Sequence, residues 1–133
     1  MTELEAGARL DVADYLRLRD AVGWRSAELD HTVIQAALDR TWNIVVREDD
    51  RIVGIGRLLD DGAFYGTIWD VIVDPPAQRR GIGTAILERL LEEAAGRAIV
   101  TLVASPMGKP LYERCGFSSD DGRGVAMLLR PNG

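Results

Sequence analysis

One segment, residues 65–104, constrains the fold of this chain more than any other. It opens with a β-rich apolar run from Tyr65 to Asp74, which two prolines close because proline cannot continue a hydrogen-bonded strand. After a glycine-containing loop, residues 82–94 carry an apolar stripe at helical spacing, with charged residues on the opposite face. A second apolar run at 98–104 has the length of a buried strand. A strand, a helix and a second strand in this order favour parallel pairing, so we expect an α/β fold.

The sequence on either side of this segment predicts antiparallel strands and further helices. The expected elements are a strand at 8–12, a helix ending by Gly23, a helix starting near Ser26 or Asp30, a hairpin around the turn 48–51, a helix at 110–115 and a strand at 125–129. Together they predict a central mixed sheet flanked by about four helices. A chain of 133 residues fits one domain of common size, so we expect a single domain over residues 1–133.

Bulk properties exclude several classes of protein. Hydrophobic residues make up 47% of the chain and charged residues 28%, which is typical of a globular protein, and the net charge of -5 argues against general nucleic-acid binding. No run approaches the roughly 20 apolar residues that span a membrane, and the first residues lack the pattern of a signal peptide, so a cytoplasmic location is expected. Cys115 and His31 alone cannot supply a zinc ligand set, so no metal site is expected.

The loop between the first apolar run and the helix has the features of a diphosphate site. Glycines let the backbone approach a ligand closely, and the free amides at a helix N-terminus attract phosphate oxygens. Arg79 and Arg80 can add positive charge from the rim. The predicted diphosphate-binding residues are Gln78, Arg79, Arg80, Gly81, Ile82, Gly83 and Thr84.

Two better-known phosphate loops match this segment less well. A Walker A loop would end in Gly-Lys-Ser or Gly-Lys-Thr, and the segment does not. The dinucleotide fingerprint matches Gly81 and Gly83, but Ile86 stands where its third glycine belongs. A dinucleotide-binding oxidoreductase fragment therefore stays only as a weak alternative.

The loop resembles the acceptor loop of the GNAT superfamily of acetyl-CoA-dependent N-acetyltransferases, in which Gln or Arg is followed by two variable residues, Gly, any residue, and Gly or Ala. Residues 78–83 fit this pattern, and the run 71–75 precedes it as in the family. Residues 111–117 resemble the later Tyr-Glu-x-x-Gly-Phe segment of the family. The order of the expected elements is similar over nearly the whole chain.

The resemblance implies a three-layer GNAT-like fold whose sheet is splayed between the strand holding Val71–Val73 and the strand holding Val100–Ala104. The pantetheine arm of acetyl-CoA would lie in the gap and pair with the main chain of Val71, Ile72 and Val73. Ser105 stands where many relatives have an asparagine that helps to hold the cofactor. The family also makes a homodimer an expectation.

The resemblance further implies that a primary amine attacks the thioester directly in a ternary complex, while a backbone N–H near Val71 or Ile72 stabilises the oxyanion. Tyr112 would protonate the departing thiolate as general acid, or else serve as an aromatic that packs its helix. From its position on the strand that holds Val71–Val73, Asp70 is the carboxylate expected to accept the proton of the amine, directly or through water, or else a residue turned to solvent near an edge. Strand alternation places Asp70 on the same face as Ile68 and Ile72.

Trp24 and Arg25, between the first two helices, are the candidate contacts to the acceptor, with simple packing as the other interpretation. The acceptor itself is open and could be a small-molecule amine or an amine of a protein or peptide. A CoA-binding module without catalysis is the main alternative to an enzyme.

Overall fold

The computed structural model describes residues 1–24 and 28–132, and the chain separates into two compact units, residues 1–103 and 104–133. The first unit is built on a five-stranded sheet in the order β1-β2-β3-β4-β5, in which β4 and β5 are parallel and the other neighbours antiparallel. Its elements are β1 (Thr2–Ala6), α1 (Val12–Ala21), α2 (His31–Asp39), β2 (Trp42–Glu48), β3 (Arg51–Asp60), β4 (Tyr65–Val73), the 3-10 turn η1 (Pro75–Ala77), α3 (Ile82–Glu93) and β5 (Ile99–Leu102).

The second unit contains α4 (Lys109–Arg114), and beyond it one isolated bridge joins Asp120 to Val125. The predicted α/β fold, with a mixed sheet and four helices in the described part of the chain, is confirmed, as is the parallel pair around the crossover helix. The second helix begins at His31 after the predicted cap Asp30, whose side chain accepts a hydrogen bond from the Thr32 N–H at 2.8 Å.

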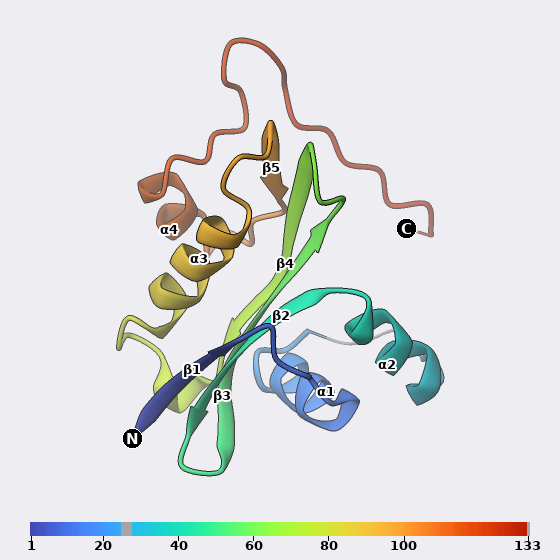
Figure 1. Cartoon of the computed structure of the whole chain (residues 1–133), viewed down its shortest axis with the longest axis vertical. Helices are drawn as coiled ribbons and strands as arrows, with labels where there is room; N and C mark the ends of the chain where they lie inside the picture. The colour runs from blue at the N-terminus through green and yellow to red at the C-terminus, as the bar shows by residue number, and fades with distance from the viewer. Residues whose placement is uncertain (25–27, 133) are drawn as a thin grey trace. The chain divides into compact units, whose positions relative to one another are not determined.

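Helices cover both faces of the sheet in the first unit (Figure 1). On one face, α1 and α2 enclose a buried cluster with the sheet: Leu10, Tyr15, Leu18, Ile34, Leu38, Val45, Ile52, Ile55 and Ile72. On the other face, α3 lies so close to β3 that a Cβ added at Gly56 would stand 2.5 Å from a methyl of Ile86. Glycine at this position therefore sets how closely helix and sheet approach.

Two predicted strands are wrong. The opening strand is Thr2–Ala6 rather than 8–12, and Val12 already begins α1. Only Leu4 of β1 is partly buried, so the strand is polar and is formed by pairing with β2, a contact that leaves no apolar pattern in the sequence. Residues 125–129 have an apolar sequence but pair with no strand in the described residues, and Met127 is 94% exposed. Apolar composition alone does not make a strand when no partner edge is present.

Candidate functional site

The sheet opens along one edge of β4. The pairing of β4 with β5 ends at Ile68 and Leu102, whereas β4 continues to Val73, so the predicted splay between these strands is confirmed. The Asp74 N–H donates to the Val53 carbonyl on β3 at 2.8 Å, and the trans peptide therefore turns the Val73 carbonyl the other way. By alternation along the strand, Val71 and Val73 present main-chain groups at the open edge, whereas those of Ile72 face β3.

A β-bulge in β4 coincides with the start of this open edge. Arg57 of β3 pairs with Trp69, but Ile55 pairs with Ile72, so two residues of β4 stand opposite the single residue between them. Asp70 lies in the bulge with φ of 53°, in the left-handed region that non-glycine residues rarely occupy.

Because of the bulge, Asp70 does not lie on the face of the sheet that strand alternation predicts together with Ile68. Ile68 pairs with Leu58 on the face covered by α3, where Gly66 lies close to Ala94, whereas Ile72 belongs to the cluster under α1 and α2. The two isoleucines therefore lie on opposite faces, and the expectation that Asp70 shares one face with both is wrong. The extra residue inverts the alternation, and no local sequence pattern marks it.

Asp70 neither turns to solvent nor stands alone, because its carboxylate lies in a polar cluster with Tyr15, Arg19 and Arg57. One oxygen is 3.0 Å from Nη1 of Arg19, and the other is 2.9 Å from Nη1 of Arg57 and accepts a hydrogen bond from the Tyr15 hydroxyl at 2.8 Å. The side chain of Asp70 is only 11% exposed. Burial, and then the negative charge of Asp70, raise the pKa of Tyr15.

The sequence did not reveal this cluster. Arg57 is 13 residues from Asp70, and Arg19 is 51 residues away, so only the fold brings them together. The single local signal was the spacing of Tyr15 and Arg19, which are four residues apart on α1 and therefore share one face of the helix. The proposed role of Asp70 as general base stays a prediction. A proton that Asp70 accepts would compete with two arginines for the same carboxylate oxygens.

Trp24 adjoins this cluster through Arg19. Its main-chain N–H donates to the Arg19 carbonyl at 2.8 Å, and the Arg19 guanidinium lies 5.8 Å from the centre of the indole ring. The indole is partly exposed, so it can both pack against Arg19 and meet a ligand. Arg25, the other predicted acceptor contact, lies outside the described residues.

The predicted diphosphate loop connects η1 to α3. Arg79 and Gly81 both have left-handed backbones, with φ of 64° and 82°. No side chain in the described part of the chain caps α3, and the helical ladder begins with Ala85 N–H donating to the Gly81 carbonyl at 3.0 Å. The main-chain amides of the first turn therefore have no partner within the helix and can bind a ligand. A Cβ at Gly81 would meet no atom within 4 Å, so the space above the loop is open.

The two arginines of the loop differ in their contacts. Arg80 forms an ion pair with Glu48 at the end of β2, and the hydrogen bond between them lowers the pKa of Glu48 and raises that of Arg80. This ion pair holds the loop against the sheet and partly neutralises the charge of Arg80. Arg79 is exposed within the loop. Gln78 instead donates from Nε2 to the Val73 carbonyl at 3.0 Å, which joins the loop to the open edge of β4.

The second unit holds the remaining predicted site residues. The Ser105 Oγ accepts a hydrogen bond from the Gly108 N–H at 3.1 Å, and a Cβ at Gly108 would stand 3.0 Å from the Tyr112 ring. Phe117 meets that ring edge-on, with the ring centres 6.2 Å apart. Burial raises the pKa of Tyr112, so its hydroxyl keeps its proton to a higher pH than an exposed tyrosine. The roles of Ser105 and Tyr112 stay predictions.

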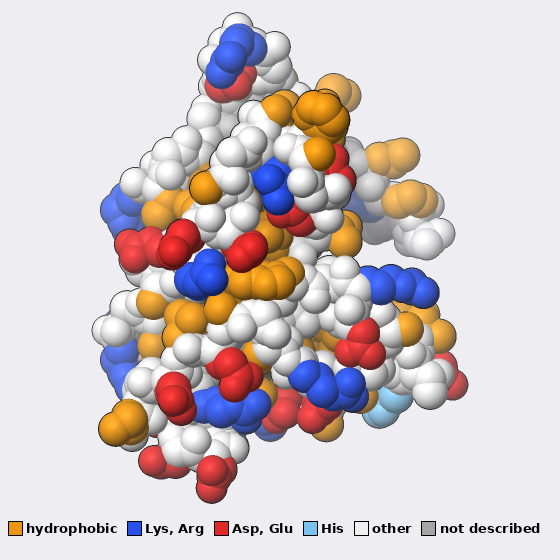
Figure 2. Space-filling model, viewed as in Figure 1, with side chains coloured by type: hydrophobic (Ala, Val, Ile, Leu, Met, Phe, Trp, Pro, Cys, Tyr) orange, Lys and Arg blue, Asp and Glu red, His pale blue; other side chains and the backbone are white. Residues whose placement is uncertain are grey.

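Other kinds of site find little support in the described residues. No group of three or more His, Cys, Asp or Glu side chains there could hold a metal ion. Within the same residues, no helix has the length and apolar character that would let it cross a membrane. Acidic and basic side chains are interspersed on the face shown in Figure 2.

Comparisons with known proteins agree with this geometry. The chain is 34% identical to the histone acetyltransferase TAP1 of Glycine max over 96% of its own length, but it spans only 60% of that relative. Its fold matches a GNAT family acetyltransferase of Streptococcus pneumoniae with a TM-score of 0.78 and 26% identity, covering 98% of this chain and 99% of that one. A predicted acetyltransferase of Clostridium acetobutylicum, solved with acetyl-CoA, shares the fold with a TM-score of 0.72 at 22% identity, covering 98% and 96%.

The sequence also matches the Acetyltransferase (GNAT) family over residues 10–117, which include the whole of the open edge and the loop. The chain therefore belongs to the GNAT family of acetyltransferases.

Proposed function

We propose that this protein moves an acetyl group from acetyl-CoA to a primary amine by direct attack in a ternary complex. The observation that carries the proposal is the continuity of the open edge of β4 with the uncapped N-terminus of α3. A pantetheine arm needs main-chain partners such as those of Val71 and the N–H of Val73, whose carbonyl already accepts a hydrogen bond from Gln78. A diphosphate needs free amides such as those of residues 82–84. Both are present along one stretch of chain, in the order that the donor requires.

Each chemical step has a candidate group in the chain. The amine nitrogen forms a bond to the acetyl carbon while the bond from carbon to sulfur breaks, and the thiolate takes a proton from Tyr112. The Val71 N–H, at the open edge, is better placed than that of Ile72 to stabilise the oxyanion. The proton of the attacking amine leaves to water or to a carboxylate.

The acceptor class is a further part of the proposal. TAP1 is a histone acetyltransferase by name, which supports a lysine side chain of a protein as one acceptor to test, beside small-molecule amines. Trp24, partly exposed on the same side as the Asp70 cluster, is the proposed contact to the acceptor. A homodimer is a proposal from the family, to be tested by light scattering.

The experiment that tests the donor site is calorimetric titration with acetyl-CoA of the native protein and of Gly81→Asp. The added carboxylate would repel the diphosphate and fill the open space over the loop, so binding should be lost. Gly62→Asp is the matched control, because Gly62 has nearly the same backbone, with φ of 79° against 82°, and equally open surroundings in a remote turn.

If the native protein and the control bind and Gly81→Asp does not, the donor site is supported and an amine screen that detects released thiol follows. If the folded native protein binds no acetyl-CoA, the proposed function is wrong. Binding without turnover of any amine would instead favour the CoA-binding module without catalysis.

A further inference from the structure

Going beyond the donor and acceptor sites, we propose that Asp70 is a positioning residue. Through Tyr15, Arg19 and Arg57 it holds the bulge of β4 and so fixes the orientation of the Val71 main chain at the open edge. The catalytic consequence rests on the proposed function. The effect on the backbone does not, so the two can be tested separately.

Asp70 has an unusual backbone conformation, with φ of 53°. A left-handed conformation is unfavourable for a residue with a Cβ, although aspartate tolerates it better than most. Such a conformation persists when the surrounding structure determines it. At Asp70 the determining contacts come from two different elements, since Tyr15 and Arg19 belong to α1 and Arg57 belongs to β3.

The partners of Asp70 are themselves held by further contacts. Besides its ion pair with Asp70, Arg57 donates from Nε to the Thr41 Oγ1 at 3.1 Å and from Nη2 to the Ala37 carbonyl at 3.3 Å. The guanidinium groups of Arg19 and Arg57 lie 5.5 and 5.4 Å from the centre of the Tyr15 ring. The side chain of Arg57 is only 13% exposed, so water competes weakly for it. The cluster therefore connects the bulge to α1, to α2 through Ala37, and to Thr41 just before β2.

Val71 connects the cluster to the open edge of β4. Val71 lies between Asp70, which the cluster holds, and Ile72, which pairs with Ile55 on β3. The orientation of its peptide groups is therefore set from both sides. If the contacts of Asp70 are removed, only the side toward Ile72 remains fixed, and the Val71 N–H can turn away from the open edge.

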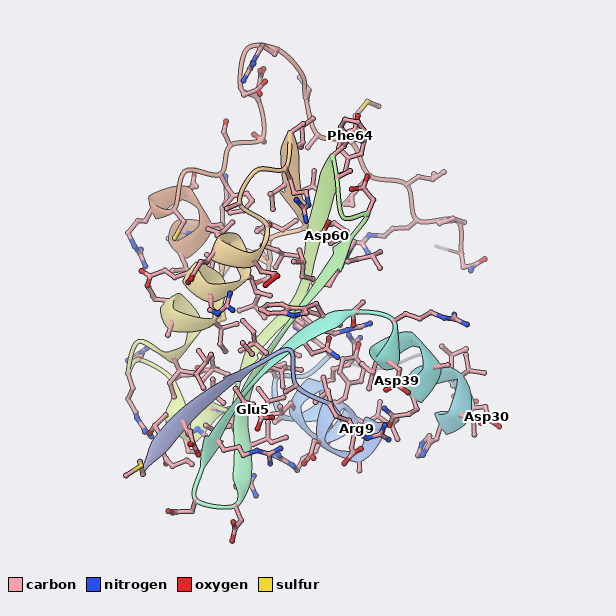
Figure 3. All side chains as sticks on the ribbon, viewed as in Figure 1. Glu5, Arg9, Asp30, Asp39, Asp60 and Phe64 are labelled. Atoms are coloured by element: carbon pink, nitrogen blue, oxygen red, sulfur yellow. The ribbon has the colours of Figure 1, made fainter. Side chains whose placement is uncertain are left out.

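The test compares Asp70→Ala, Asp70→Asn and Asp70→Gly with the native protein. Asparagine tolerates the left-handed backbone and can still accept hydrogen bonds, glycine keeps only the backbone freedom, and alanine keeps neither. Asp60→Asn is the matched control, because Asp60 forms a comparable ion pair, 2.7 Å from Arg97 Nε and 15% exposed. Asp60 lies near the turn between β3 and β4 (Figure 3), and its strand partner Gly66 precedes the bulge.

Two measurements separate positioning from general stability. In the ligand-free protein, the amide resonance of Val71 and its hydrogen exchange are recorded by NMR. With acetyl-CoA and an amine from the screen, kcat and KM for acetyl-CoA are measured. We expect Asp70→Ala to shift the Val71 resonance, to speed its exchange, and to lower kcat by about 100-fold at nearly unchanged KM, the loss typical of a misplaced oxyanion donor. Asp70→Asn should recover part of both.

The proposal is overturned if the Val71 amide and kcat of Asp70→Ala match the native protein, or if Asp60→Asn changes them equally. It is also overturned if Asp70→Gly behaves as native, since backbone freedom alone would then suffice. If the native protein binds no acetyl-CoA, the proposed function fails, while the NMR comparison still decides whether Asp70 holds the bulge.

Discussion

Tyr112 can act as a general acid only while its hydroxyl keeps the proton, and its burial favours that form. We predict that Tyr112→Phe lowers kcat by about 100-fold or more while the calorimetric affinity for acetyl-CoA stays the same, because only proton transfer to the thiolate is lost. In the native enzyme the alkaline loss of kcat should occur above the ordinary tyrosine range, at a pH above about 10.

The pH profile of kcat checks the prediction for Tyr112. Tyr65→Phe is the control, because Tyr65 is 59% exposed at the start of β4. If Tyr112→Phe keeps the native kcat, the role of the Tyr112 ring is to pack against Phe117 and Gly108. The proton for the thiolate would then come from another group or from water.

Tyr15 contributes to the stability of the fold through its hydroxyl. Its hydroxyl donates to the largely buried carboxylate of Asp70, and a hydrogen bond to a charged group contributes about 1.5–3 kcal/mol. Tyr15→Phe should therefore lower the free energy of unfolding by that amount at neutral pH. Because the pKa of Tyr15 is raised in the folded state, this contribution is complete below about pH 10 and is lost as the pH rises through the folded pKa.

Urea unfolding of native protein and Tyr15→Phe at several pH values tests this linkage. The gap between the two free energies should shrink with rising pH above about 10. A gap that is absent at neutral pH would mean that Tyr15 contributes packing alone.

Among the elements, the packing of α3 on β3 positions the diphosphate loop, since the loop leads directly into the helix. A Cβ at Gly56 would lie 2.5 Å from Ile86 and 2.9 Å from Leu90, so the helix would have to move outward. We predict that Gly56→Ala lowers the free energy of unfolding by about 1–3 kcal/mol and also weakens acetyl-CoA binding.

The control for Gly56→Ala is Gly124→Ala, where an added Cβ meets no atom within 4 Å and the change should stay within about 0.5 kcal/mol. Urea unfolding and calorimetry supply the two readouts. If Gly56→Ala is as stable as the native protein, the helix is more adaptable than its close contact with β3 indicates.

The elements also show what the sequence could and could not predict. The order of strand, loop, helix and strand could be predicted because apolar residues recur with the spacing of a strand or of a helix in each element between Tyr65 and Leu102. β1 was missed because its polar residues gain strand structure only from pairing with β2. The bulge was not predicted because it is defined only by the pairing of β4 with β3. The partners of Asp70 were not predicted because contacts between residues far apart in the sequence produce no local pattern. In the site, the loop was therefore predictable and the polar cluster was not.

At the scale of the whole molecule, the single domain predicted from length requires residues 1–103 and 104–133 to unfold together. The chain offers one natural probe for each unit. Its three tryptophans are Trp24, Trp42 and Trp69, all in the first unit, and its single cysteine is Cys115 in the second. Tryptophan fluorescence and the reactivity of the thiol can thus follow the two units in the same urea series.

We predict that both probes give one midpoint, because coincident transitions are the mark of two-state unfolding. Acetyl-CoA at about 100 times its Kd should raise the free energy of unfolding from both probes by about 2.7 kcal/mol, if both units belong to the folded state that binds it. Gly81→Asp should abolish that rise. Labelling of Cys115 at lower urea than the fluorescence change would contradict a single domain, and a ligand effect confined to the tryptophans would assign donor binding to residues 1–103 alone.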